Sequence, residues 1–132
     1  METFRHLLYR EKELAKLYIE KYGEQYNKIE YDVHIGNGVV SGEEKEDKYR
    51  NMFQHLTKKR IDMVGHTKTE IHIVEFRPMA DIRQIGKLLT YGLLYSKTFP
   101  TTKEIKLILV TDNILPDDKM AAEEYDIEVI II

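Results

Sequence analysis

Asp62 and Glu75 each stand among apolar neighbours, in two adjoining segments that have the alternating pattern of β-strands. A hairpin closed over residues 67–70 pairs His66 with Ile71. Because side chains alternate between the two faces of a strand, the same register places Asp62 opposite Glu75. Two facing carboxylates repel each other unless a cation lies between them or one of them holds a proton. The acid pair is therefore a candidate site for metal or proton chemistry.

The composition limits the kinds of protein that this chain can be. It has 132 residues, of which 42% are apolar and 33% are charged, and it has no cysteine. This length suits one compact domain over residues 1–132. No apolar run approaches the roughly 20 residues of a membrane span, so we expect no membrane association. The absence of cysteine excludes disulfides and thiolate metal sites, and it fits a cytoplasmic protein.

The net charge of −3 gives the whole chain no general attraction to nucleic acid. Binding to nucleic acid would therefore need a local basic patch or a bound metal. Lys58, Lys59 and Arg60 form such a basic cluster directly before Asp62. Three basic residues in a row occur on many surfaces, but positive charge beside an acid pair is what phosphate chemistry needs.

Helical and strand patterns alternate along the chain and predict the elements that position the acid pair. The predicted elements are a helix over residues 4–22, a strand over 28–35, the two hairpin strands, a helix over 82–96, a strand over 104–111, a helix over 116–125 and a strand over 128–132. Residues 41–48 carry mixed charges and predict an exposed, mobile loop. Residues 49–56 fit either a strand or a turn. The order α-β-β-β-α-β-α-β predicts an α/β domain of three layers, α/β/α, with a mixed sheet.

The spacing of side chains predicts which of them share a face. In the strand over 28–35, one face is expected to hold Ile29, Tyr31, Val33 and Ile35. In the helix over 82–96, the core face is expected to hold Ile82, Ile85, Leu88, Leu89, Gly92 and Tyr95. Beside that face, Gln84, Lys87 and Tyr91 recur at helical spacing and form a polar seam.

Glu11 interrupts the apolar stripe of the first predicted helix, among Leu7, Leu8, Leu14 and Ala15. Its side chain either reaches water at the helix start or points into the site as a third acid. The acid pair also has an interpretation without metal, in which ion pairs to Arg60, Arg77 or Lys87 neutralise it. Both alternatives stay open from the residues alone.

Other familiar chemistries have no motif here. The histidines His34, His55, His66 and His72 are scattered, and no spacing predicts a zinc site. There is no glycine-rich phosphate loop, so we expect no small-molecule cofactor. A Ser-His-Asp triad has no supporting motif either.

The order of elements, with one acid on its second strand and one on its third, resembles the PD-(D/E)XK nuclease superfamily. The restriction-endonuclease-like core of that family runs α-β-β-β-α-β, and the resemblance covers residues 5–111. In the family a lysine follows two residues after the second acid, whereas this chain has Arg77 there. The next helix resembles the Gln-x-x-x-Tyr helix of recombination and repair exonucleases, with Lys87 at the glutamine position and Tyr91 at the tyrosine position. C-terminal to this core, the chain adds a helix and a strand.

The resemblance implies a metal site. Asp62 and Glu75, with the main-chain carbonyl of Phe76 and with Glu11, would bind Mg²⁺ or Mn²⁺ through oxygen atoms. Such a metal lowers the pKa of a bound water and neutralises charge on the scissile phosphate.

The resemblance also implies roles for the basic and polar residues around the metal. A guanidinium does not lose its proton, so Arg77 would stabilise charge on the phosphate rather than act as a base. Lys87 would replace the missing lysine from the neighbouring helix and position or activate the water. Gln84 and Tyr91 would hold the phosphate backbone by hydrogen bonds.

These expectations lead to two main hypotheses and a third. The first is a metal-dependent nuclease that acts on DNA with low sequence specificity and belongs to a phage or mobile element. The alternative is a catalytically inactive domain of the same fold that binds nucleic acid or a protein partner, as a homodimer. A small structural protein with a bridged acid pair is the third.

Overall fold

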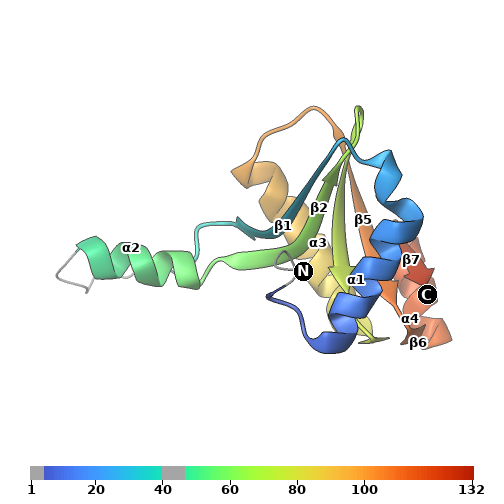
Figure 1. Cartoon of the computed structure of the whole chain (residues 1–132). Helices are drawn as coiled ribbons and strands as arrows, with labels where there is room; N and C mark the ends of the chain where they lie inside the picture. Colours follow the sequence, from blue (N-terminus) through green and yellow to red (C-terminus); the bar gives the residue numbers. More distant parts are fainter. Residues whose placement is uncertain (1–4, 40–46) are drawn as a thin grey trace.

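The protein is described by a computed structural model that covers residues 5–39 and 47–132 (Figure 1). Five strands form one mixed sheet in the order β1-β2-β3-β5-β7. These strands are β1 (Lys28–Ile35), β2 (Lys59–His66), β3 (Glu70–Phe76), β5 (Glu104–Thr111) and β7 (Ile127–Ile131). Strands β1, β2 and β3 pair antiparallel, whereas β3, β5 and β7 pair parallel.

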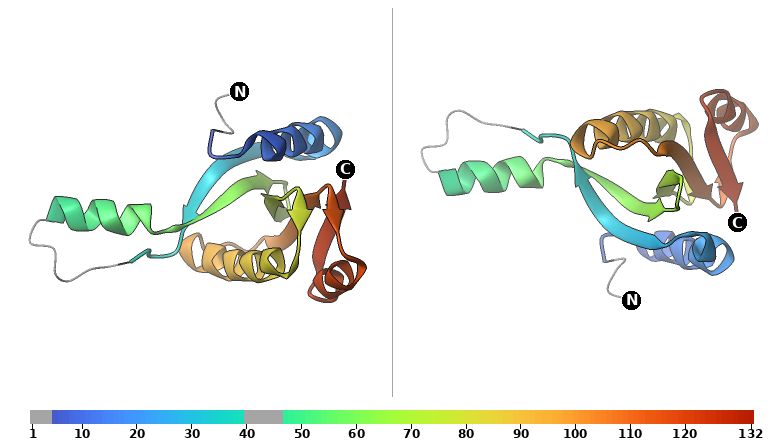
Figure 2. Two further views of the ribbon diagram at one scale, coloured as in Figure 1. Left: turned by 90° about the horizontal axis from the view of Figure 1, so that it is seen from below. Right: turned by 90° about the horizontal axis from the view of Figure 1, so that it is seen from above.

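Helices cover both faces of the sheet (Figure 2). Helix α1 (Tyr9–Tyr22) packs on β3 and β5 from one side, and α3 (Ile82–Thr98) packs on β1, β3 and β5 from the other. Helix α4 (Pro116–Glu124) packs beside β7. The predicted three-layer α/β/α fold with a mixed sheet is confirmed.

Each face of the sheet has its own hydrophobic core. The core under α1 includes Leu14, Tyr18, Met63, Val74 and Phe76. The core under α3 includes Ile61, Val64, Ile73, Leu88 and Leu109. Burial of these side chains stabilises each interface in proportion to the apolar area removed from water. Within the described residues, no helix is both long and apolar enough to cross a membrane.

The stretch that fitted a strand or a turn is a helix, α2 (Asp47–Leu56), which stands away from the sheet (Figure 1). Most of the loop predicted over residues 41–48 lies outside the described residues. Three short elements complete the described part of the chain: a 3₁₀ helix η2 (Gly23–Gln25) and the two strands of a small parallel sheet, β4 (Met79–Ala80) and β6 (Asn113–Ile114).

Strands β2 and β3 form the predicted hairpin, and His66 pairs with Ile71 as expected. On β2, the Tyr26 ring packs directly against Gly65, and a Cβ atom at this position would lie 2.4 Å from the ring. This close packing requires glycine at position 65 and so helps to set the register of β2. The buried His72 ring lies on the same side, with its Nδ1 atom 2.8 Å from the Tyr26 hydroxyl. These contacts hold the register that brings the two acids level with each other.

Strand β1 changes face at Asp32, where the backbone is left-handed with φ 54°. This conformation costs energy for a residue with a side chain, and both carboxylate oxygens of Asp32 are held by Arg60, at 2.7 and 2.6 Å. Before Asp32 the apolar residues pack on the α1 side, and after it they pack on the α3 side. The predicted single face of Ile29, Tyr31, Val33 and Ile35 is therefore wrong.

Helix α3 is rotated relative to the predicted core face. Gln84 and Tyr91, which were expected in a polar seam beside the core, are buried, whereas Ile82 and Leu89 are exposed. The Gln84 side chain accepts a hydrogen bond from the Asp81 main-chain N–H at 2.8 Å and so completes the helix N-terminus. Burial of this amide is possible because the helix start supplies its partner.

Candidate functional site

The two acids lie where the strands of the hairpin separate. The pairing of β2 with β3 ends at Met63 and Val74, one position before the acids. Beyond that point, main-chain N–H groups of the two strands donate to carboxylate oxygens instead of to main-chain carbonyls of the opposite strand. The Asp62 N–H donates to Glu75 Oε1 at 3.0 Å, and the Phe76 N–H donates to Asp62 Oδ2 at 3.0 Å. Each acid is thus held by the opposite strand, and the predicted neighbourhood of Asp62 and Glu75 is present in the structure.

Glu75 is only 4% exposed, although it carries a carboxyl group. Its pKa is raised well above the ordinary value of 4.5, first by burial and then by the negative charge of Asp62. The Asp62 N–H and the ammonium of Lys87 act in the opposite direction. The Lys87 Nζ atom lies 3.9 Å from Glu75 Oε2 and is half exposed, so it balances only part of the negative charge of the pair. The site therefore favours a proton or a cation between the acids.

The raised pKa of Glu75 predicts a pH-dependent stability when no metal is bound. The Glu75 carboxyl holds its proton more tightly in the folded protein than in the unfolded chain. Its contribution to the free energy of unfolding is therefore complete below pH 4.5 and is lost as pH rises through the pKa of the folded state. We expect the free energy of unfolding in EDTA to fall from pH 5 to pH 8 more steeply for the wild type than for Glu75→Gln. Urea unfolding at several pH values measures this. Parallel curves for the two proteins would contradict the prediction.

His6 also lies at the site, although no sequence pattern predicted a role for it. Its Nε2 atom lies 3.5 Å from Asp62 Oδ1. The same atom is buried and has no hydrogen-bond partner among the described residues. A buried nitrogen without a partner is costly and rare. His6 lies ahead of α1 and outside any motif, so no local signal in the sequence marks it.

Two residues of α3 face the acids, as the resemblance implied. Lys87 approaches Glu75, and its Nζ atom lies 6.0 Å from the centre of the Tyr91 ring. The pKa of Tyr91 is raised to about 12, mainly by burial and further by the charges of Glu75 and Asp62. Tyr91 therefore stays neutral, and its side chain is buried near the acids. Gln84, by contrast, is buried at the helix start, where its carbonyl is already bonded.

Glu11 and Arg77 make no hydrogen bond or ion pair with the two acids among the described residues. The Glu11 side chain accepts a hydrogen bond from the Leu8 N–H at 3.0 Å and helps begin α1. Arg77 lines a small cavity with Glu11, and no ion pair joins it to either acid among the described residues. Within the same residues, no group of three or more His, Cys, Asp or Glu side chains could hold a metal ion. The structure thus brings Glu11 together with Arg77, not with the acid pair.

In the basic cluster of Lys58, Lys59 and Arg60, one of the three positive charges is already paired with an acid. Both oxygens of Asp32 hold the Arg60 guanidinium, so this charge is already paired. Lys59 is exposed at the start of β2, and Lys58 is half-buried just before it. Two lysines of the predicted cluster therefore keep a charge that could meet phosphate.

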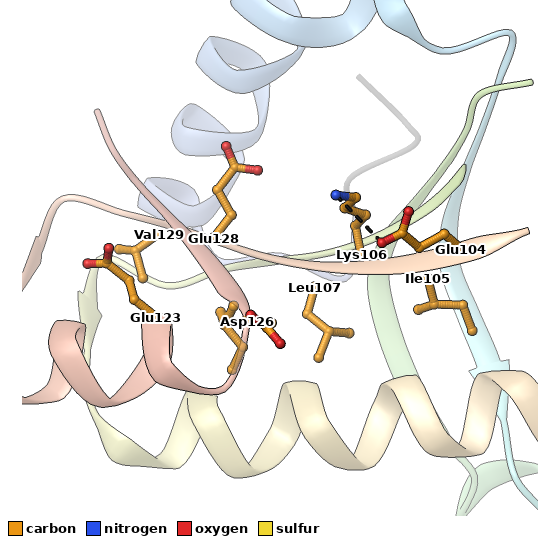
Figure 3. Close-up of a pocket in the computed structure, with 9 residues that line it drawn as sticks. Glu104, Ile105, Lys106, Leu107, Glu123, Asp126, Glu128 and Val129 are labelled. Atoms are coloured by element: carbon orange, nitrogen blue, oxygen red, sulfur yellow. Dashed lines mark ion pairs between the residues drawn. The ribbon is translucent and has the colours of Figure 1, made fainter. Parts of the chain in front are cut away.

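A cavity of about 620 Å³ lies elsewhere, between the first halves of β5 and β7 and the end of α4 (Figure 3). The acid pair lies at the opposite end of the parallel strands, because Glu75 is level with Leu109 of β5. Four acidic residues line the cavity: Glu104, Glu123, Asp126 and Glu128. Its single basic residue, Lys106, is paired with Glu104 at 3.8 Å. A cavity of this charge repels phosphate, so it does not suit nucleic acid.

Comparisons with known proteins support the fold. No protein-family model and no curated protein sequence matches the chain. A repair endonuclease from Pyrococcus abyssi is similar in structure, with a TM-score of 0.57, 15% sequence identity and 92% of this chain covered. The EndoMS protein in its complex with double-stranded DNA is similar with a TM-score of 0.55, 15% identity and 92% of this chain covered. The chain spans 46% and 44% of these two proteins, less than half of either.

Proposed function

We propose that this protein is a metal-dependent nuclease that hydrolyses phosphodiester bonds in DNA at Asp62 and Glu75. The observation that carries the proposal is a buried carboxyl group placed against a second one, each held by the main chain of the opposite strand. Repulsion between two carboxylates is unfavourable in a purely structural site, whereas a divalent cation between them is bound by both negative charges. The similar fold of a repair endonuclease and of the EndoMS protein in complex with double-stranded DNA supports DNA as the substrate.

The donor set fits Mg²⁺ or Mn²⁺. These ions prefer oxygen ligands, and Mg²⁺ sites often use one or two carboxylates, with water and substrate phosphate completing the shell. Asp62 and Glu75 would hold the ion together with the main-chain carbonyl of Phe76, so a third acid is not required. When bound, the metal supplies a water of lowered pKa and neutralises charge on the phosphate.

The side chains around the acids have distinct tasks in this proposal. Lys87 holds the attacking water or gives a proton to the leaving oxygen, since an ammonium near an acid pair can do either. Arg77 remains charged and binds phosphate beside the site. Tyr91 excludes water from the inner side of the acid pair, because its ring is buried there. Exposed Lys59 and half-buried Lys58 attract the DNA backbone from further away.

The direct test is a cleavage assay with labelled single- and double-stranded DNA in Mn²⁺, in Mg²⁺ and in EDTA. We expect cleavage with either ion and none in EDTA. Cleavage that persists in EDTA would contradict metal dependence, and no cleavage under any condition would contradict the nuclease. Low sequence specificity would be visible as many product bands. Homodimerisation and association with a phage or mobile element stay predictions from the sequence.

His6 should act by holding Asp62 in place. Polar side chains that lie behind metal ligands and orient them typically affect metal affinity or activity by about 10- to 100-fold. We therefore expect His6→Ala to lower cleavage by about that factor and to raise the Mn²⁺ concentration needed for half activity. His6→Gln should restore part of the loss, because its amide can donate to Asp62. The exposed His55 gives a matched control, and His55→Ala should behave as wild type. An equal loss in both alanine variants would contradict the role of His6.

One observation favours the inactive alternative. The Lys87 ammonium lies within ion-pair distance of Glu75, so part of the charge is already balanced without metal. In that case the domain binds nucleic acid or protein through its surface. DNA binding without metal, equal in wild type and Asp62→Asn and without cleavage, would identify this function.

A further inference from the structure

A small cavity of about 250 Å³ lies between the start of α1 and the turn that follows β3. It is lined by Leu8, Arg10, Glu11, Arg77, Pro78 and Met79. Two of these side chains are apolar and project into solvent, because Leu8 is 71% exposed and Met79 is 63% exposed. The cavity thus offers apolar walls from two different segments of the chain, beside charged groups.

Both walls of the cavity belong to segments of the chain that directly follow residues of the candidate site. Arg77 follows Glu75 by two residues, and Leu8 follows His6 by two residues. His6 in turn lies 3.5 Å from Asp62. Two residues of extended chain span at most about 7 Å. A nucleotide adjacent to a phosphate at the acid pair can therefore reach this cavity.

Of the charged side chains that line the cavity, only that of Arg77 is without a hydrogen-bond or ion-pair partner among the described residues. Arg10 is paired with Asp112 and with Glu13. The Glu11 carboxylate is bonded to the start of α1. Arg77 has no ion-pair partner among the described residues. A guanidinium of this kind can bind a phosphate with its N–H groups and can stack its plane on an aromatic ring.

We propose that this cavity is a subsite for one unpaired nucleobase, that of the nucleotide next to the scissile phosphate. The ring lies between Leu8 and Met79, and Arg77 contacts its plane or its phosphate. Enzymes that take a base out of the stack hold it between apolar or aromatic side chains in this way. The inference rests on the proposed nuclease function and adds to it a preference for single-stranded or frayed DNA.

The test uses a labelled oligothymidine with one abasic residue at a fixed position, and product bands are read at every bond. Stacking of a base on an aromatic side chain typically contributes a factor of about ten in binding, and burial of a base between the aliphatic side chains of Leu8 and Met79 is expected to contribute in the same direction. We expect wild-type protein in Mn²⁺ to cut the bond next to the abasic residue about tenfold less than the other bonds. The other bonds of the same molecule are the internal control.

Substitutions then show whether the cavity is responsible. The double variant Leu8→Ser, Met79→Ser should cut normal oligothymidine about tenfold more slowly and should no longer distinguish the abasic position. Met120 is exposed to a similar degree on α4, and Met120→Ser should leave both results unchanged. Thermal unfolding confirms that each variant is folded. Equal cutting at every bond by the wild type, or undiminished discrimination in the double variant, would overturn the subsite.

The same oligonucleotides separate this inference from the proposed function. Fluorescence anisotropy measures their binding in Ca²⁺, where cleavage is not needed. Cleavage without any abasic effect supports the nuclease and rejects the subsite. Weaker binding of the abasic strand without cleavage under any condition rejects the nuclease and keeps the subsite.

Discussion

Glu75→Gln and Asp62→Asn should each lower the rate of DNA cleavage by a factor of about 1000 or more. A bound metal contributes several kcal/mol to the reaction, and each 1.4 kcal/mol is a factor of ten. In Glu75→Gln the amide oxygen of the new side chain can still accept the Asp62 N–H, so the local fold is preserved. Cleavage rates in Mn²⁺ measure the loss.

The same substitutions should not destabilise the protein. Removing one of two repelling carboxylates relieves the cost of burying Glu75, so the melting temperature at pH 8 in EDTA should stay equal or rise. Glu104→Gln removes an exposed acid at the opposite end of the sheet and serves as the control, with wild-type cleavage expected. Full activity of Glu75→Gln would exclude the acid pair as the site. A melting temperature that falls with activity would mean that the pair is structural.

Lys87→Ala should lower cleavage by about 100-fold, the second largest effect. Positioned proton donors and acceptors typically contribute factors of about 10² to 10⁴. Lys87 lies within ion-pair distance of the acids, with its Nζ atom 3.9 Å from Glu75, whereas Arg77 lines the neighbouring cavity. Rates measured across a pH series give both the loss and its pH dependence.

Lys87→Arg decides what the ammonium does. A guanidinium supplies charge but does not give up its proton, so Lys87→Arg should remain as slow as Lys87→Ala if proton transfer is needed. Lys97→Ala, in the last turn of the same helix, is the matched control. Cleavage restored by arginine would show that Lys87 only balances charge. Undiminished cleavage in Lys87→Ala would show that α3 does not supply the missing lysine.

The hairpin and its acid pair were predictable because they depend on a local rule. Side chains in a strand alternate strictly, so the choice of turn fixes which residues face each other. His66 meets Ile71, and Asp62 therefore comes beside Glu75. The fold class followed from the alternation of helices and strands, which is also a local signal.

The remaining features depend on contacts between distant segments. The left-handed backbone at Asp32 exists because Arg60, 28 residues away in the chain, holds its carboxylate, and no spacing rule reveals this. The rotation of α3 follows from the partner that Gln84 finds at Asp81. His6 reaches Asp62 only through the path of the chain before α1, so its role appears only in three dimensions.

Diffraction from crystals soaked in Mn²⁺, recorded where manganese scatters anomalously, is the most direct measurement. We expect a single strong peak between the carboxylates of Asp62 and Glu75, at distances of about 2.0–2.5 Å from their oxygen atoms. No peak there, with Glu75 bound to Lys87 and Asp62 bound to His6, would show that the pair is neutralised by the protein itself and that no metal-dependent hydrolysis takes place at this site.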